Sequence, residues 1–175
     1  MYPVAIFAFT VLATAPPSEQ IDDERDRVAS AFAKSFYDKY DFAKVEPILA
    51  KKVVKLKASD QGGRAFIKLN GPILADADAK TVEIIRAEPG KIGNWLLRVR
   101  EAAPDFYGRN IPADLDRSDL PAHVAKGWPQ LFKEIENGGT PFCIIGEVEG
   151  GFRGGIIIVV RHIESAPKIT LVDDQ

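Results

Sequence analysis

The two histidines of this sequence are His123 and His162, and their side chains are the best suited to acid–base chemistry near neutral pH. His162 ends a run of isoleucine and valine, whereas His123 falls on a predicted surface helix. In an acid–base enzyme of the isomerase, dehydratase or hydrolase type, His162 would need a carboxylate partner such as Asp41. The alternative, which we favour, is a structural histidine at the end of a sheet.

Cys143 is the only cysteine, which excludes an internal disulfide and a zinc centre built from cysteines. It lies in an apolar stretch typical of a strand, so we expect a small buried hydrophobic side chain. One hairpin register would bring Cys143 opposite His162 as a nucleophile beside its base, but nothing in the sequence places a carboxylate to orient them.

Two acidic patterns resemble metal sites without completing one. Residues 114–119 begin like a calcium loop, but the sixth and twelfth positions hold Asp119 and Ala125 where such loops need Gly and Glu. We therefore predict a loop that caps a following helix. Asp76 and Asp78 are assigned to the first turn of another helix, where the helix dipole favours negative charge. No metal and no cofactor are expected.

Basic residues gather near a predicted strand over 53–57, at Lys51, Lys52, Lys55 and Lys57. A phosphate-binding strip is one interpretation of this cluster. A solvated face, or a charged edge that blocks strand addition, is the one we favour. The glycine-rich stretch over 150–155 is assigned to a hairpin loop, because no helix follows it to direct N–H groups at an anion.

Aromatic side chains supply the candidates for a ligand-binding pocket. We assign Tyr37, Tyr40 and Trp95 to such a pocket, together with His162. Aromatic rings bury large areas, and Tyr and Trp keep a polar group that can orient a ligand. Packing in the core is the alternative explanation for most of them.

The composition fits one globular domain. The chain has 175 residues, of which 46% are hydrophobic and 27% are charged, and its formal net charge is −2. That balance gives no field strong enough to attract nucleic acid or an acidic membrane.

The N-terminal segment predicts export. Residues 4–15 are apolar or small, and no charged side chain precedes Glu19. The run is too short to cross a bilayer but suits the core of a signal peptide. We expect a signal peptide over 1–13, a linker over 14–20 and one domain over 21–175, in a periplasmic or secreted protein. A cytoplasmic location is the alternative.

Hydrophobic periodicity predicts the elements that must hold these residues. Helices are expected over 21–40, 42–51 and 76–86, with two short helices between 120 and 136, strands over 53–57 and 64–69, and a long loop over 101–119. Periodicity does not decide between strand and helix for 95–99.

The C-terminal third predicts a meander of three strands over 142–148, 156–163 and 168–172. Two-residue turns at 150–151 and 165–166 would place Cys143 opposite Ile158 and His162 opposite Ile169. One face, which we expect to meet the first helix, would then carry Cys143, Ile145, Ile158, Val160, His162, Ile169 and Leu171. Arg161 would lie on the other face, covered by another subunit or by the 101–139 segment.

The opening of the chain resembles the nuclear transport factor 2-like domains. From Asp23 to Leu56 it shows a long helix, an acidic turn at Tyr40-Asp41-Phe42, a short helix ending at Leu49, and a strand. With the C-terminal meander, the resemblance covers about half the chain. It implies a curved sheet wrapped on helices around a conical pocket. That scaffold hosts isomerases, dehydratases, ligand binders and structural modules.

Taken together, the sequence predicts an α+β domain with N-terminal helices packed on a curved antiparallel sheet. We expect a module that binds a small apolar ligand or a protein partner. The alternatives are the acid–base enzyme described above and a structural module that forms a homodimer through the outer sheet face.

Overall fold

The computed structural model describes residues 17–56, 62–76, 78–104, 122, 126 and 128–174. The expected signal peptide over 1–13, the calcium-like loop over 114–119 and His123 lie outside these residues. The first helix begins at Pro17, so residues 17–20 of the expected linker are helical.

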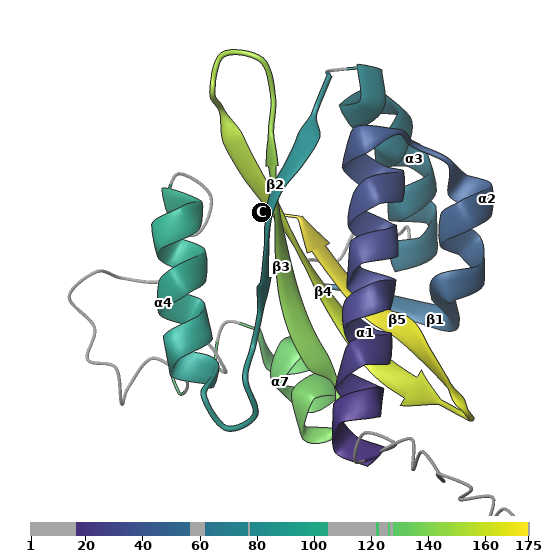
Figure 1. Cartoon of the computed structure of the whole chain (residues 1–175), viewed down its shortest axis with the longest axis vertical. Helices are drawn as coiled ribbons and strands as arrows, with labels where there is room; N and C mark the ends of the chain where they lie inside the picture. Colours follow the sequence, from purple (N-terminus) through teal and green to yellow (C-terminus); the bar gives the residue numbers. More distant parts are fainter. Residues whose placement is uncertain are drawn as a thin grey trace, which may run out of the picture.

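Five strands form one mixed sheet in the order β1-β5-β4-β3-β2, which confirms the α+β class (Figure 1). Their bounds are β1 Leu49–Lys55, β2 Lys80–Arg86, β3 Thr140–Glu147, β4 Arg153–Ile163 and β5 Ala166–Asp174. The C-terminal meander is confirmed, since β3, β4 and β5 pair antiparallel in sequence order. The sheet is not wholly antiparallel, because β1 pairs with β5 in parallel. Helices and three other strands separate β1 from β5 in the chain, so no tight turn forces them to run oppositely.

Helices pack on both faces of this sheet. The N-terminal group comprises α1 Pro17–Ala33, the π-helical turn η1 Lys34–Asp38, α2 Phe42–Val45, the 3₁₀ turn η2 Glu46–Ile48 and α3 Gly63–Asp76. The other group contains α4 Ile92–Ala102 and α7 Pro129–Glu136. Figure 1 shows the strands passing between α4 and the N-terminal helices. Each group buries its own hydrophobic cluster against the sheet, one around Phe32 and Phe36 and the other around Trp95 and Leu131.

The hairpin between β3 and β4 has a longer turn than the glycine pair at 150–151 predicts. Val148 N–H donates to the carbonyl of Phe152 over 3.0 Å, which leaves three residues in the turn. Gly150 and Gly151 both take positive φ there, a conformation that glycine adopts readily because it has no Cβ atom. The extra residue moves the register by one, so Cys143 pairs with Ile157 rather than Ile158.

This shift divides the predicted face. Ile158, Val160 and Ile169 pack in the α1 cluster as expected, whereas Cys143, Ile145 and Leu171 pack with α4 and α7. A bulge contributes to the division, because Val160 pairs with Ile169 and Val159 pairs with Leu171. His162 pairs with Pro167 rather than Ile169, but its ring lies on the α1 side as predicted. Arg161 faces α7.

Three local predictions were wrong. Residues 64–69 belong to helix α3, and residues 80–86 form strand β2 instead of a helix over 76–86. Asp76 is therefore the last residue of α3, and Asp78 lies in the turn before β2 with a φ of 51°, so neither starts a helix. The short second helix ends at Ile48, because β1 begins at Leu49. Residues 95–99 are helical, within α4.

The outer face of the sheet is covered from within the chain. Trp95 and Leu96 of α4 and Leu131 of α7 are buried against it, and α7 belongs to the 101–139 segment expected there. Homodimer formation stays a prediction. None of the helices in the described ranges is long and apolar enough to cross a membrane.

Candidate functional site

A small apolar pocket opens beside Tyr37, one of the residues predicted to bind a ligand. Its volume is about 190 Å³. Its walls come from η1, α3 and the β3–β4 hairpin, and its lining residues are Tyr37, Phe66, Asn70, Ile73, Gly146, Val148, Phe152, Gly154, Gly155 and Ile156. Apolar groups and one amide make up most of this lining, a composition common in small-molecule sites.

Glycines on two paired strands make room for the pocket. Gly146 pairs with Gly154, and Ile145 pairs with Gly155, so three of the four residues in these two pairs carry no side chain. A Cβ atom on Gly146 would overlap the ring of Tyr37. Glycine weakens a strand interior and marks places where another group approaches the backbone closely. Here the group that approaches is the Tyr37 ring, which forms one wall of the pocket.

The π-helical turn η1 positions Tyr37. Lys39 N–H donates to the carbonyl of Lys34 over 3.1 Å, the five-residue spacing of a π-helix. Such turns inside helices occur frequently at functional sites. The Asp38 carboxylate accepts a hydrogen bond from Thr81 N–H over 3.0 Å, which ties the turn to β2. The Phe36 ring packs edge-on against Tyr37, with centroids 5.4 Å apart.

Helix α3 supplies the opposite wall through Phe66, Asn70 and Ile73. The Asn70 amide donates to the carbonyl of Phe66 over 2.9 Å, so its side chain is held along the helix. Pro72 lies inside α3 and has no N–H to give to the carbonyl of Lys68, four residues earlier.

Tyr40 compensates for that missing hydrogen bond. Its hydroxyl is shared between the carbonyls of Lys68 and Ile67, at 3.1 and 3.2 Å. Its ring lies where a Cβ atom on Gly71 would be, so the helix and the ring approach closely. Burial raises the pKa of Tyr40 above its ordinary value. Tyr40 is therefore a positioning residue for the α3 wall and does not line the pocket.

Trp95 lies away from this pocket, on the other face of the sheet. Its indole N–H donates to the carbonyl of Ile85 over 2.9 Å, and its ring is buried in the cluster under α4. Because its N–H group is bonded and its ring is buried, core packing is sufficient to explain the position of Trp95.

His162 lies near the N-terminal half of α1 rather than near the pocket. Its Nε2 atom is 3.7 Å from the Glu24 carboxylate, beyond hydrogen-bond range. Asp41 caps α2 through Ala43 N–H and forms an ion pair with Lys44. Asp41 follows the far end of the same helical run, roughly 20 Å from Glu24 by helix rise. The structure does not bring His162 and Asp41 together.

Cys143 is buried, as predicted, but on the opposite side of the sheet from His162. The nucleophile–base pair considered from the sequence is therefore not formed.

Most of the pocket lining was not predicted from the sequence. Phe66, Asn70 and Ile73 follow one another at the spacing of a helix face, and this periodicity could have identified them. The strand prediction for 64–69 concealed it. The role of Gly146 and Gly154 depends on the hairpin register, which the turn length determines.

No family model, curated protein or solved structure matched the chain. The resemblance to nuclear transport factor 2-like domains stays a prediction. Within the described ranges, no group of three His, Cys, Asp or Glu side chains is placed to hold a metal ion.

Proposed function

We propose that this protein is a binding module that takes an apolar group into the Tyr37 pocket. The observation that carries the proposal is the pocket itself, with glycines along one side and an aromatic wall on the other. At about 190 Å³ the pocket suits one ring or one branched side chain. The ligand is a small molecule with such a group, or a partner protein that inserts one.

Exposed hydrophobic side chains at the mouth of the pocket support this function. Ile73 is 64% exposed and Phe152 is 52% exposed, although both line the pocket. Large apolar side chains that gather at a concave site, rather than singly, mark binding surfaces. A bound apolar group would cover both.

Indole is a suitable probe, because it is a single flat ring system with one polar group. We expect a titration followed by NMR to shift the backbone amide signals of Gly146, Gly154 and Ile73. The variant Ile73→Asp should weaken indole binding by about tenfold, since a charge at the mouth opposes burial of an apolar ring.

Leu69→Asp is the matched control. Leu69 lies on the same helix and is 53% exposed, but it does not line the pocket. Its variant should bind indole like the natural protein. Equal losses in both variants, or shifts of signals spread over the whole sheet, would contradict the proposed site.

Export completes the proposed function, supported by the uncharged apolar run over 4–15. Mass spectrometry of the native protein should find an N-terminus near Thr14. Intact Met1 on protein recovered from the cytoplasm would contradict it.

A further inference from the structure

A second, larger cavity lies on the other face of the sheet, between α7 and strands β1, β4 and β5. It is a groove of about 810 Å³, within the size range of small-molecule sites. Gln130, Lys133 and Glu134 reach it from α7, while both lysines at the start of β1 reach it from the sheet edge. We call it the basic groove.

Two strand irregularities meet at the basic groove. On β1, Leu49 pairs with Ile169 and Val54 pairs with Leu171, so β1 carries three more residues than β5 between these pairs. Consequently Lys51 and Lys52 are both exposed, although neighbours on a regular strand point to opposite faces. On β5 the bulge beside Val159 and Val160 leaves Thr170 as the additional residue. Bulges of this kind redirect side chains and are common next to functional sites.

The charge in the groove opposes that of the whole chain. Five basic side chains and two acidic ones line it, which gives a local net charge of +3 in a chain whose formal net charge is −2. The basic ones are Lys51, Lys52, Lys133, Arg161 and Lys168. Across the described part of the chain, no ion pair occupies Lys51, Lys52 or Lys133. A concave surface of one sign concentrates ions of the other.

Glu134 is already engaged by its neighbours. The hydroxyl of the bulged Thr170 donates to its carboxylate over 2.7 Å, and Arg161 Nε lies 3.6 Å from the same oxygen. The side chain of Glu134 is only 13% exposed. Its negative charge is thus partly balanced.

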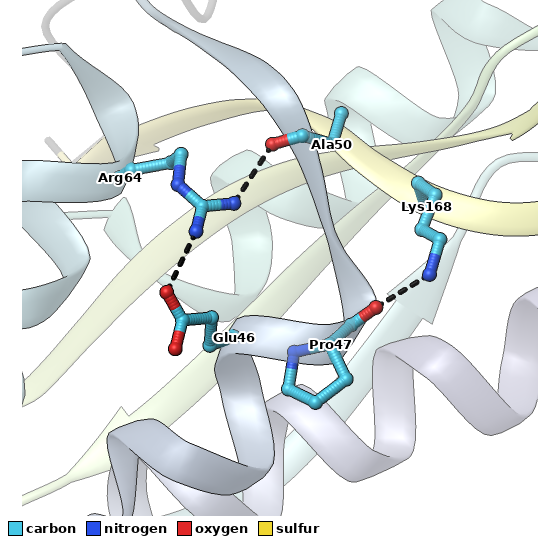
Figure 2. A network of polar contacts seen from close by, with 5 residues as sticks. All are labelled: Glu46, Pro47, Ala50, Arg64 and Lys168. Carbon is cyan, nitrogen blue, oxygen red and sulfur yellow. Dashed lines mark hydrogen bonds and ion pairs between the residues drawn. The ribbon is translucent and has the colours of Figure 1, made fainter.

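Lys168 lines the groove and is held in place by the backbone that leads into β1. Its ammonium group donates to the carbonyl of Pro47 in η2, directly before β1 begins (Figure 2). Arg64 holds the same corner from α3, by donating to the carbonyl of Ala50 and to the Glu46 carboxylate. These contacts anchor both ends of the chain segment that leads to Lys51, so the lysine pair is carried by a constrained backbone.

We propose that the basic groove binds a small molecule with two or more oxyanion groups, either phosphates or carboxylates. Lys51, Lys52 and Lys133 hold the anionic groups, and Arg161 can add a planar pair of donors. Apolar contacts from Val54 and Ile163 would cover the body of the ligand. This site is independent of the Tyr37 pocket, which lies on the other face of the sheet.

Calorimetry on the full chain tests the site, with inorganic pyrophosphate and citrate as probes. The natural protein should bind at least one of them. The double variant Lys51→Gln/Lys52→Gln should lose about tenfold or more in affinity, while Lys34→Gln/Lys39→Gln, a charge-matched pair outside the groove, should change it less than about twofold. Binding of pyrophosphate alone identifies a phosphate ligand, and binding of citrate alone a carboxylate ligand.

NMR on the natural protein keeps the test independent of how the variants fold. Pyrophosphate or citrate should shift the amide signals of Lys52, Lys133 and Thr170, and leave those of Gly146 and Ile73 unchanged. Absence of binding to both probes would overturn the proposal. Equal losses in the two double variants would also overturn it, because they would show a general charge effect.

Discussion

Tyr40 donates its hydroxyl hydrogen to the carbonyl of Lys68, the one helical carbonyl of α3 that Pro72 leaves without its N–H partner. Tyr40 follows α1 and η1, so it supplies a hydrogen bond to a helix that begins more than twenty positions later in the chain. Because α3 forms one wall of the Tyr37 pocket, this hydrogen bond links helix stability to the proposed binding site.

The first prediction tests that link. Tyr40→Phe should lower the free energy of unfolding by about 1–2 kcal/mol, because the Lys68 carbonyl loses its partner while the ring still packs on Gly71. Pro72→Ala restores an N–H group to α3. In that background Tyr40→Phe should cost clearly less, which urea unfolding of the four proteins can measure as a coupling energy. Additive effects would show that Tyr40 and Pro72 act separately.

The second prediction concerns alkaline pH. Burial raises the pKa of the Tyr40 phenol, so the folded protein favours the neutral form. The stability that this contributes is fully present below the unfolded-state pKa of about 10, and it is lost as the pH rises through the folded-state pKa. The difference in unfolding free energy between the natural protein and Tyr40→Phe should therefore shrink above about pH 10. A difference that stays constant or grows would contradict this assignment.

The third prediction concerns the space that Gly146 leaves for the Tyr37 ring. Gly146→Ala should cost about 1–3 kcal/mol of stability, because the new methyl group overlaps the tyrosine ring and forces it to move. Indole binding should fall in the same variant. Gly62→Ala is the control, since a methyl group there meets nothing within 4 Å, and it should cost less than about 0.5 kcal/mol. If the two variants melt alike, Gly146 does not hold the ring in place.

The sequence supports the class of the fold and the three C-terminal strands, because their apolar runs and turn residues are strong local signals. The burial of Cys143 is also predicted correctly. Tyr37 lines a cavity, and its role in ligand binding stays a prediction. Pairing is harder to predict. One extra residue in the turn near Gly150, and one bulge at Thr170, decide which side chains share a face.

Residues 64–69 show a second reason why the sequence alone did not predict the structure. Pro72 lies within α3, so sequence rules place a boundary before it, whereas the observed helix continues to Asp76. The hydroxyl of Tyr40 supports that continuation from outside the segment. A contact between distant parts of the chain thus overrides the local preference, and a window of neighbouring residues does not contain this information.

The last prediction concerns Glu134. It rests on the proposed anion site. Glu134→Gln removes one of the two carboxylates in the basic groove and releases Arg161 from its ion pair. The glutamine oxygen can still accept the hydrogen bond from Thr170, so the fold should be retained. Repulsion between Glu134 and a bound anion would disappear, and affinity for pyrophosphate or citrate should rise by about threefold or more. The gain should diminish at high salt, because screening weakens the repulsion that the substitution removes.

Glu164→Gln is a useful comparison, since Glu164 lines the same groove at the exposed turn between β4 and β5 and should produce a smaller gain. Weaker binding in Glu134→Gln, with an unchanged melting temperature, would mean that Glu134 contributes to the ligand site as an acceptor, and the oxyanion class would then be wrong.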